Sequence, residues 1–247
     1  MEETIVKLEH VAKRYGKCTA LKDCTLKLEW DRIYGLVGKN GAGKTTMMRL
    51  IAGLDMPDDG RVTLFSQKPA GMLIEAPGLI ENMTAAENLK FFGMLSKTVK
   101  TKTEKTEKTE KTEAFGAEEV LSLVGLENDR HKKVKDYSLG MRQRLGIAVA
   151  ILGKPEFVML DEPINGLDPI GVVEIRKLIK RLCEEFGMTV FISSHNLPEL
   201  YQTANDFLFI DGGVIKKEIT QKQLEAESHE SLEAYFLSVI QAVDGRQ

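Results

Sequence analysis

The chain has 247 residues, enough to bury a full core as one large domain or as two closely packed subdomains. Its 34 Lys and Arg residues nearly balance 37 Asp and Glu residues, and the net charge of −3 gives no electrostatic case for nucleic-acid binding. The 3 cysteines show no C-x-x-C spacing, which favours reduced thiols. No signal peptide is recognisable, and no apolar stretch approaches the roughly 20 residues of a membrane-spanning helix.

The N-terminal part is predicted to be rich in strands. Alternating apolar and polar side chains at residues 4–9 and 25–30 are typical of half-buried strands. Residues 33–37 are an apolar run, and a helical pattern follows at residues 46–52. Strands are predicted at residues 4–9, 25–30, 33–37, 60–65 and 72–75.

A glycine-rich loop joins the strand at 33–37 to this helix. It reads G-x-x-x-x-G-K-T-T and consists of Gly38, Lys39, Asn40, Gly41, Ala42, Gly43, Lys44, Thr45 and Thr46. The backbone N–H groups of such a loop, and the positive end of the helix after it, bind phosphates. Lys44 would contact the β- and γ-phosphates, and Thr45 would offer a hydroxyl to Mg²⁺. The complete motif in this context predicts a nucleoside triphosphate, although glycine-rich turns also occur without one.

The middle of the chain is predicted to be helical. A helix over residues 84–95 opens with the capping box T-A-A-E, and further helices follow at 117–124 and from the N-cap Ser138 to about 153. Residues 97–113 are a low-complexity segment of Thr, Glu and Lys that cannot bury a core. We expect a solvated connector there. Its ion pairs favour a helix and its threonines disfavour one, so both helix and coil stay possible.

After residue 155, strands alternate with helices, which indicates a mostly parallel α/β sheet. The apolar run at 157–160 suits a strand that is buried on both faces. A helix with one apolar stripe follows from the N-cap Asp168. The remaining predictions are strands at 189–193 and 207–210, a hairpin turn at 211–213 and a helix at about 231–241.

Two carboxylates, Asp161 and Glu162, end the buried strand. In a nucleotide site, the aspartate would hold Mg²⁺ and the glutamate would take a proton from the attacking water. Alone, such a pair could equally be two solvated carboxylates. The run D-E-P-I-N-G-L-D-P at residues 161–169, together with the phosphate loop, resembles the ATP-binding cassette (ABC) ATPases, although Ile164 stands where the family usually has threonine.

The resemblance assigns roles to further residues. His195 is at the place of the switch histidine, and Tyr15 is at the place of the aromatic residue on which adenine stacks. The segment Y-S-L-G-M is similar to the signature L-S-G-G-Q with three positions changed, but a plain capped helix start is the alternative. Ser138 and Gly140 keep a hydroxyl and a backbone N–H for the γ-phosphate held by a second subunit. Asp168 belongs to the D-loop of the family.

Glu75 departs from the family pattern. Alignment of residues 73–89 puts it where cassettes carry a glutamine that meets Mg²⁺ and the membrane part of the transporter. A carboxylate can replace the amide oxygen while adding a full charge; a misaligned surface carboxylate is the alternative. The motifs I-E-x-P-G and S-L-G-M-x-Q-R-L-G are similar to cassettes of bacitracin- and lantibiotic-type export and self-immunity systems.

The resemblance implies a single ABC ATPase domain over residues 1–247. Its P-loop NTPase core would have a mostly parallel sheet, an N-terminal antiparallel β subdomain and an inserted helical subdomain at about 77–153. The implied catalytic residues are Glu162, His195, Lys44 and Glu75, and the implied metal-binding residues are Thr45, Asp161 and Glu75, with ATP and Mg²⁺ bound.

The implied function is an energy-coupling subunit at the cytoplasmic face of the membrane. Its partners would be a multi-span permease and a second cassette, in a homodimer or a heterodimer, and its cargo an antimicrobial peptide or other amphiphile pumped outward. Two other classes stay open: a soluble ABC protein that acts on ribosomes or DNA, and a nucleotide sensor without turnover. The single cassette argues against the first class, and Glu162 and His195 argue against the second.

Overall fold

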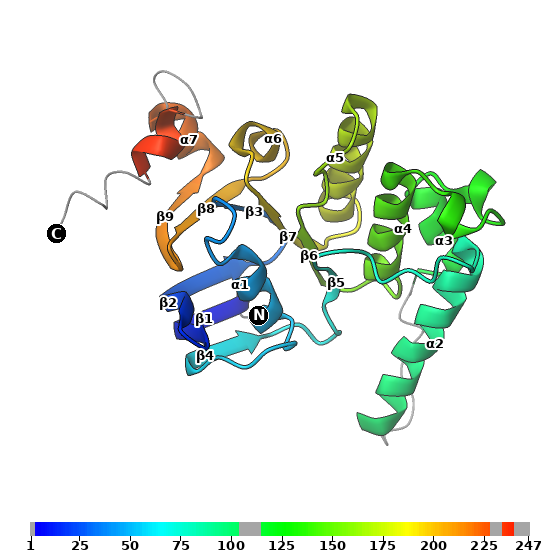
Figure 1. Ribbon diagram of the computed structural model, residues 1–247, viewed down its shortest axis with the longest axis horizontal. Coiled ribbons are helices and arrows are strands. Elements are labelled where there is room, and N and C mark those ends of the chain that lie inside the picture. Colours follow the sequence, from blue (N-terminus) through cyan, green and yellow to red (C-terminus); the bar gives the residue numbers. More distant parts are fainter. Residues whose placement is uncertain (1–2, 104–114, 228–233, 240–247) are drawn as a thin grey trace.

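The computed structural model describes residues 3–103, 115–227 and 234–239. Its strands form two sheets, and most of the helices lie above and to the right of them in Figure 1. The strands are β1 (Thr4–Tyr15), β2 (Cys18–Glu29), β3 (Ile33–Val37), β4 (Asp59–Leu64), β5 (Gly71–Leu73), β6 (Phe157–Asp161), β7 (Thr189–Ser194), β8 (Asp206–Asp211) and β9 (Val214–Thr220). The helices are α1 (Lys44–Ile51), α2 (Ala85–Thr103), α3 (Ala117–Leu123), α4 (Leu139–Ile151), α5 (Pro169–Glu184), α6 (Leu197–Tyr201) and α7 (Gln221–Glu227).

The N-terminal sheet is antiparallel, with β1 between β2 and β4. Leu8 of β1 pairs with Leu26 of β2, and both side chains are buried. Both β1 and β2 are longer than predicted, because β1 runs on to Tyr15 and β2 begins at Cys18. The pairing shifts between Leu8 and Val11, so the regular alternation on which the prediction relied is interrupted there.

The central sheet has the strand order β5-β6-β7-β3-β8-β9 and is parallel except for β9. Every residue of β3, β6 and β7 is buried, as expected for strands that are covered on both faces. These three strands are neighbours, with Asp161 opposite Ser193 and Val37 opposite Ser194. The phosphate loop, the two carboxylates at the end of β6 and His195 therefore all lie at the same edge of the sheet.

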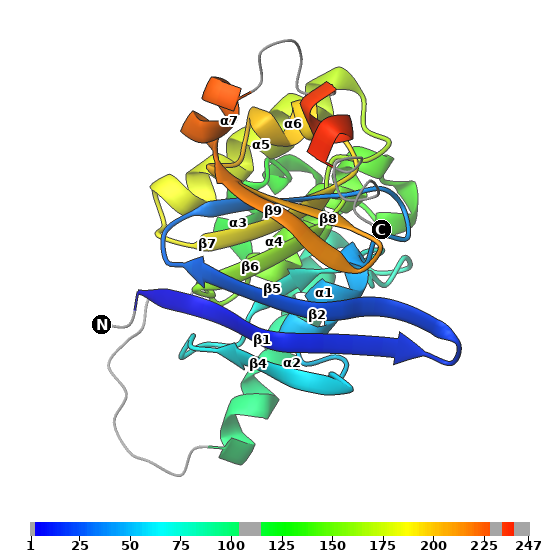
Figure 2. The ribbon, with the colours of Figure 1, turned by 90° about the vertical axis from the view of Figure 1, so that its left-hand side faces the viewer.

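Two apolar clusters cover the faces of the central sheet. On β3, Ile33 and Val37 belong to the cluster shared with α4 and α5, whereas Tyr34 and Leu36 face the N-terminal sheet and α1. Helix α1 contacts β2, β4 and β6. It is therefore fixed between the two sheets, which are seen one in front of the other in Figure 2.

Helices α2, α3 and α4 lie together on one side of the central sheet (Figure 1). The capping box is present: the Thr84 N–H donates to Oε2 of Glu87 at 2.8 Å, and the Glu87 N–H donates to Oγ1 of Thr84 at 3.2 Å. Helix α2 continues to Thr103, so the first residues of the Thr-Glu-Lys segment are helical. Residues 104–113 of that segment lie outside the described residues. The subdomain limits at 77 and 153 stay a prediction.

The C-terminal part contains the predicted hairpin, β8–β9, and two helices that were not predicted. Helices α6 and α7 have five and seven residues, too few for a periodic apolar pattern. Of the helix expected at 231–241, residues 234–239 are described and helical. The rings of Tyr235 and Phe236 pack 5.9 Å from that of Phe209. No helix in the described part of the chain is long and apolar enough to cross a bilayer.

Candidate functional site

The phosphate loop, residues 38–43, connects β3 to α1. Two of its glycines are required by close backbone contacts: a Cβ on Gly38 would lie 2.5 Å from the Ile210 carbonyl oxygen, and one on Gly43 would lie 2.7 Å from the Ala20 carbonyl oxygen. Gly43 also has a φ of 110°, in the left-handed region that favours glycine. The loop thus brings backbone N–H groups to the start of α1, where an anion is stabilised.

Lys44 folds back over this loop. Its side chain is only 6% exposed, and Nζ donates to the carbonyl oxygens of Gly38 at 2.7 Å and Lys39 at 3.3 Å. The same Nζ lies 3.3 Å from Oε1 of Glu162. The positive charge is therefore held inside the curve of the loop.

Asp161, the last residue of β6, is 5% exposed and accepts hydrogen bonds from two hydroxyls. Oγ1 of Thr45 donates to Oδ2 at 2.7 Å, and Oγ of Ser193 donates to Oδ1. Ser193 was not predicted from the sequence as a residue of the site. Its hydroxyl also accepts from the N–H of Glu162 at 3.0 Å, so it contacts both acidic residues. The available signal was its place in the S-S-H run that ends β7.

Glu162 connects the phosphate loop to His195. Its Oε2 lies 2.8 Å from Nδ1 of His195, while its Oε1 faces Lys44. The backbone of Glu162 has a φ of 49°, in the left-handed region that is costly for a residue with a side chain. Its N–H donates to the Ser193 carbonyl oxygen at 3.2 Å, and this bond helps to hold the unusual conformation. Such local strain clusters at functional sites.

Thr45 and Asp161 fit a Mg²⁺ ion that arrives with a nucleotide. Among residues 3–103, 115–227 and 234–239, no three His, Cys, Asp or Glu side chains gather as a ready-made metal cluster. Mg²⁺ in nucleotide sites is held by one or two protein oxygens, and phosphates and waters complete its shell. A hydroxyl and a carboxylate 2.7 Å apart at a phosphate loop are oxygen donors of this kind.

Tyr15 ends β1 and is 44% exposed. Its hydroxyl donates to Oδ2 of Asp55 at 2.6 Å, and this bond, with some burial, raises the pKa of the phenol. A weaker, opposite effect on this pKa comes from the side chain of Thr46, in the first turn of α1. Nζ of Lys13 lies 5.4 Å from the ring centre. An exposed ring is available for stacking.

Glu75 lies between β5 and α2, and its side chain is 64% exposed. Its Oε1 is 3.3 Å from Nη1 of Arg49, on α1. The backbone of Glu75 has a φ of 66°, again in the left-handed region. The structure therefore places Glu75 beside the helix that follows the phosphate loop, in an ion pair with Arg49.

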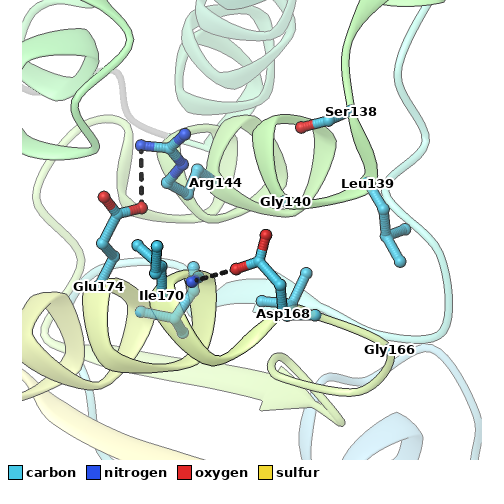
Figure 3. A pocket seen from close by; sticks show the side chains of 11 residues that line it. Ser138, Leu139, Gly140, Arg144, Gly166, Asp168, Ile170 and Glu174 are labelled. Carbon is cyan, nitrogen blue, oxygen red and sulfur yellow. Dashed lines mark hydrogen bonds and ion pairs between the residues drawn. The ribbon is translucent and has the colours of Figure 1, made fainter.

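The signature segment and the D-loop share a cavity of about 370 Å³ (Figure 3). Ser138 and Gly140 line it from the start of α4, and Asp168 lines it from the start of α5. Oγ of Ser138 accepts from the Met141 N–H at 3.3 Å, which confirms the predicted N-cap. None of residues 38–46 lines this cavity, so the signature and the phosphate loop of one chain form two separate sites.

Two apolar side chains stand at this cavity. Leu139 is 55% exposed and Ile170 is 73% exposed. Nη1 of Arg144 lies 3.4 Å from Oε2 of Glu174 and ties α4 to α5 (Figure 3). The cavity is therefore lined by exposed apolar side chains and by an ion pair between its two helices.

The fold and these residues define a P-loop nucleoside triphosphatase, and comparison with known proteins identifies the kind. The sequence matches the protein family described as ABC transporter over residues 21–165. It is similar to the bacitracin transport ATP-binding protein BcrA of Enterococcus faecalis, with 39% identity over 94% of this chain and 74% of that protein. It is also similar to the lantibiotic transport ATP-binding protein SrtF of Streptococcus pyogenes, with 36% identity over 94% of this chain and 96% of that protein.

Solved structures of ATP-binding cassettes have the same fold. The ATP-binding cassette MJ0796, described as a dimer in a post-hydrolysis state bound to ADP and Pi, matches with a TM-score of 0.73 and 25% identity, over 87% of this chain and 98% of that one. The fold of cbiO1 from Clostridium perfringens matches with a TM-score of 0.74 and 24% identity, over 92% of each chain. The chain therefore belongs to the ABC transporter family, as an ATP-binding subunit with ATPase activity. The resemblance and the fold class predicted from the sequence are confirmed.

Proposed function

We propose that this ATPase powers a membrane permease that exports an antimicrobial peptide or another amphiphile, for resistance or self-immunity. The observation that supports this cargo is the similarity over almost the whole chain to ATP-binding proteins of bacitracin and lantibiotic transport. The chain would act at the cytoplasmic face of the membrane, bound to the permease. The permease and its cargo remain the proposed part of the function.

For the ATPase site, we propose a division of roles among five residues. Lys44 and the loop N–H groups bind the β- and γ-phosphates, and Tyr15 stacks on adenine. Thr45 and Asp161 hold Mg²⁺, which would neutralise charge on the phosphate oxygens when bound. Glu162 accepts the proton of the attacking water.

We also propose that His195 and Lys44 control Glu162 by contacting its two carboxylate oxygens. His195 lies 2.8 Å from Oε2 and keeps the carboxylate oriented. Lys44 lies 3.3 Å from Oε1, so a bound triphosphate would compete with Glu162 for the same ammonium group. ATP would in this way free one carboxylate oxygen for the water.

A second cassette would complete each ATP site. The separation of the signature cavity from the phosphate loop within one chain supports this proposal. Ser138, Gly140 and Asp168 would then face the nucleotide of the other subunit. The exposed Leu139 and Ile170 would be covered by that subunit. The dimer can be a homodimer or a heterodimer.

The cargo proposal is tested in cells that express the chain together with any multi-span permease whose gene neighbours its own. We expect higher tolerance of bacitracin or a lantibiotic than in cells with the Glu162→Gln variant. Equal tolerance, despite measured phosphate release by the purified wild-type chain, would rule out the proposed cargo. Absence of phosphate release would instead favour a nucleotide sensor.

A further inference from the structure

A chain of polar contacts runs from Tyr15 to Glu75. The Tyr15 hydroxyl donates to Oδ2 of Asp55 at 2.6 Å, and the same oxygen accepts from Nε of Arg49 at 3.1 Å. Nη1 of Arg49 then lies 3.3 Å from Oε1 of Glu75. The two donors to Asp55 hold the pKa of its carboxyl below its ordinary value, so it stays ionised. Asp55 is the junction of this contact chain.

The loop after α1 fixes this junction. The N–H groups of Leu54 and Asp55 both donate to the Arg49 carbonyl oxygen, at 2.9 and 3.3 Å. Asp55 therefore contacts Arg49 through its backbone as well as its side chain. The side chain of Arg49 has one nitrogen on Asp55 and another on Glu75, which limits the directions in which it can point.

Arg49 holds Glu75 at a defined place relative to the metal-binding hydroxyl. Thr45 and Arg49 are four residues apart on α1, so they lie on the same face, one turn apart. The carboxylate of Glu75 is thus held by a residue that lies one helical turn beyond Thr45. A glutamine at position 75 has no charge with which to pair with a guanidinium, so the departure from the family pattern is matched by Arg49.

We propose that Arg49 is a positioning residue. It keeps the Glu75 carboxylate paired, and so away from the phosphates, while the nucleotide enters its site. Asp55 links this pair to Tyr15. Stacking of adenine on Tyr15 and release of Glu75 from Arg49 would therefore affect the same contacts. The physical reason is charge: an unpaired carboxylate beside the β- and γ-phosphates repels them. This inference rests on the proposed roles of Tyr15 and the phosphate loop, and on the place beside the nucleotide that the sequence predicts for Glu75.

A double-mutant cycle without metal tests the proposal. Binding of a fluorescent, ribose-labelled ATP analogue in EDTA is measured for the wild type, Arg49→Gln, Glu75→Gln and the double variant. We expect Arg49→Gln to weaken binding about threefold to fivefold, the size usual for a partly exposed ion pair. With Glu75→Gln already present, the same change should weaken binding less than about twofold.

Two further variants separate positioning from general effects. Arg181→Gln removes the same charge from an exposed ion pair at the C-terminal end of α5, where Nε lies 3.1 Å from Oε1 of Glu185, and should leave nucleotide binding unchanged. Arg49→Lys keeps the charge and should restore most of the lost affinity. Because all these groups are exposed, the coupling should shrink in 1 M salt.

The proposal is overturned by an equal loss in both backgrounds, since Arg49 would then attract the phosphates directly. It is also overturned if Arg49→Gln has no effect in either background. If the wild type binds and hydrolyses nucleotide normally but the Arg49 and Glu75 substitutions show no coupling, the proposed function still stands. A wild-type chain that binds no nucleotide would overturn that function as well.

Discussion

The ammonium group of Lys44 lies 3.3 Å from Oε1 of Glu162, so the lysine proposed to bind phosphate and the proposed general base form an ion pair. Nδ1 of His195 lies 2.8 Å from the other carboxylate oxygen. The carboxylate therefore has a basic group on each oxygen, one from the start of α1 and one from the end of β7. A nucleotide that recruits Lys44 changes the surroundings of Glu162 directly.

The first prediction concerns Glu162 as the base. Glu162→Gln keeps the size of the side chain but cannot accept a proton, so turnover should fall roughly 10²–10⁴-fold. ATP binding should persist, because the loop and Lys44 are intact. Phosphate release and binding of a labelled ATP analogue measure the two effects. Hydrolysis near the wild-type rate would assign the base to another residue.

The second prediction concerns Ser193, which only the structure revealed. Its hydroxyl contacts both Asp161 and the N–H of Glu162. Hydrogen bonds to charged groups contribute ~1.5–3 kcal/mol, so Ser193→Ala should reduce ATPase activity roughly 10- to 100-fold. The Mg²⁺ concentration needed for half-maximal activity should rise.

Ser194→Ala is the matched control for this prediction. Ser194 is equally buried, and its hydroxyl accepts from the Asn196 N–H at 3.0 Å and contacts neither carboxylate. Its loss should lower the melting temperature with little effect on the Mg²⁺ dependence. If both variants shift the Mg²⁺ dependence alike, Ser193 has no special role.

Much of the site could be predicted because its signals are local in the sequence. The phosphate loop is one contiguous run, and an apolar strand followed by Asp161 and Glu162 marks a strand end. The sequence could also indicate that these strand ends meet, since parallel strands place their carboxyl ends at one edge. The mostly parallel α/β sheet followed from the alternation of strands and helices after residue 155, and the arrangement of the subdomains followed from the resemblance to ABC ATPases.

The rest depends on side-chain directions that sequence spacing does not contain. Ser193 and Ser194 are neighbours of the same type, and only the strand pairing shows that Ser193 faces Asp161. The Arg49–Glu75 pair joins α1 to the segment between β5 and α2, and the two residues share no sequence motif. Helix α6 was missed because five residues are too few to show a period.

A third prediction concerns the pH dependence of stability. Burial raises the pKa of Tyr34 to about 12, while its hydroxyl accepts from the Glu29 N–H at 2.8 Å. The folded-state pKa is above the unfolded value of about 10, so the stabilisation is complete below pH 10 and is lost as the pH rises through 12. The loss amounts to ~2–3 kcal/mol.

Tyr34→Phe tests this dependence by chemical denaturation between pH 8 and pH 12. The variant should be less stable by ~1 kcal/mol at pH 8, because the Glu29 N–H loses its acceptor. Its stability should fall less steeply than that of the wild type above pH 10. Parallel profiles would mean that Tyr34 ionises without destabilising the fold.

The last prediction asks whether Glu75 reaches the metal during turnover. Glu75→Gln restores the usual residue of the family and removes one negative charge. If the carboxylate contacts Mg²⁺ in the working enzyme, basal ATPase activity should persist, but its dependence on Mg²⁺ and Mn²⁺ concentration should shift to higher metal concentration, because a neutral amide attracts a cation less strongly. Metal titrations of wild type and variant at fixed ATP measure the shift.

The control for this titration is Glu81→Gln, which removes the same charge from a carboxylate of the same exposure. Oε1 of Glu81 lies 3.2 Å from Nη1 of Arg142, and its side chain is 64% exposed, as is that of Glu75. A shift caused only by the net charge of the protein would appear in both variants. A shift confined to Glu75→Gln indicates contact with the metal, whereas curves that superimpose on the wild type would make Glu75 a surface carboxylate with no part in catalysis.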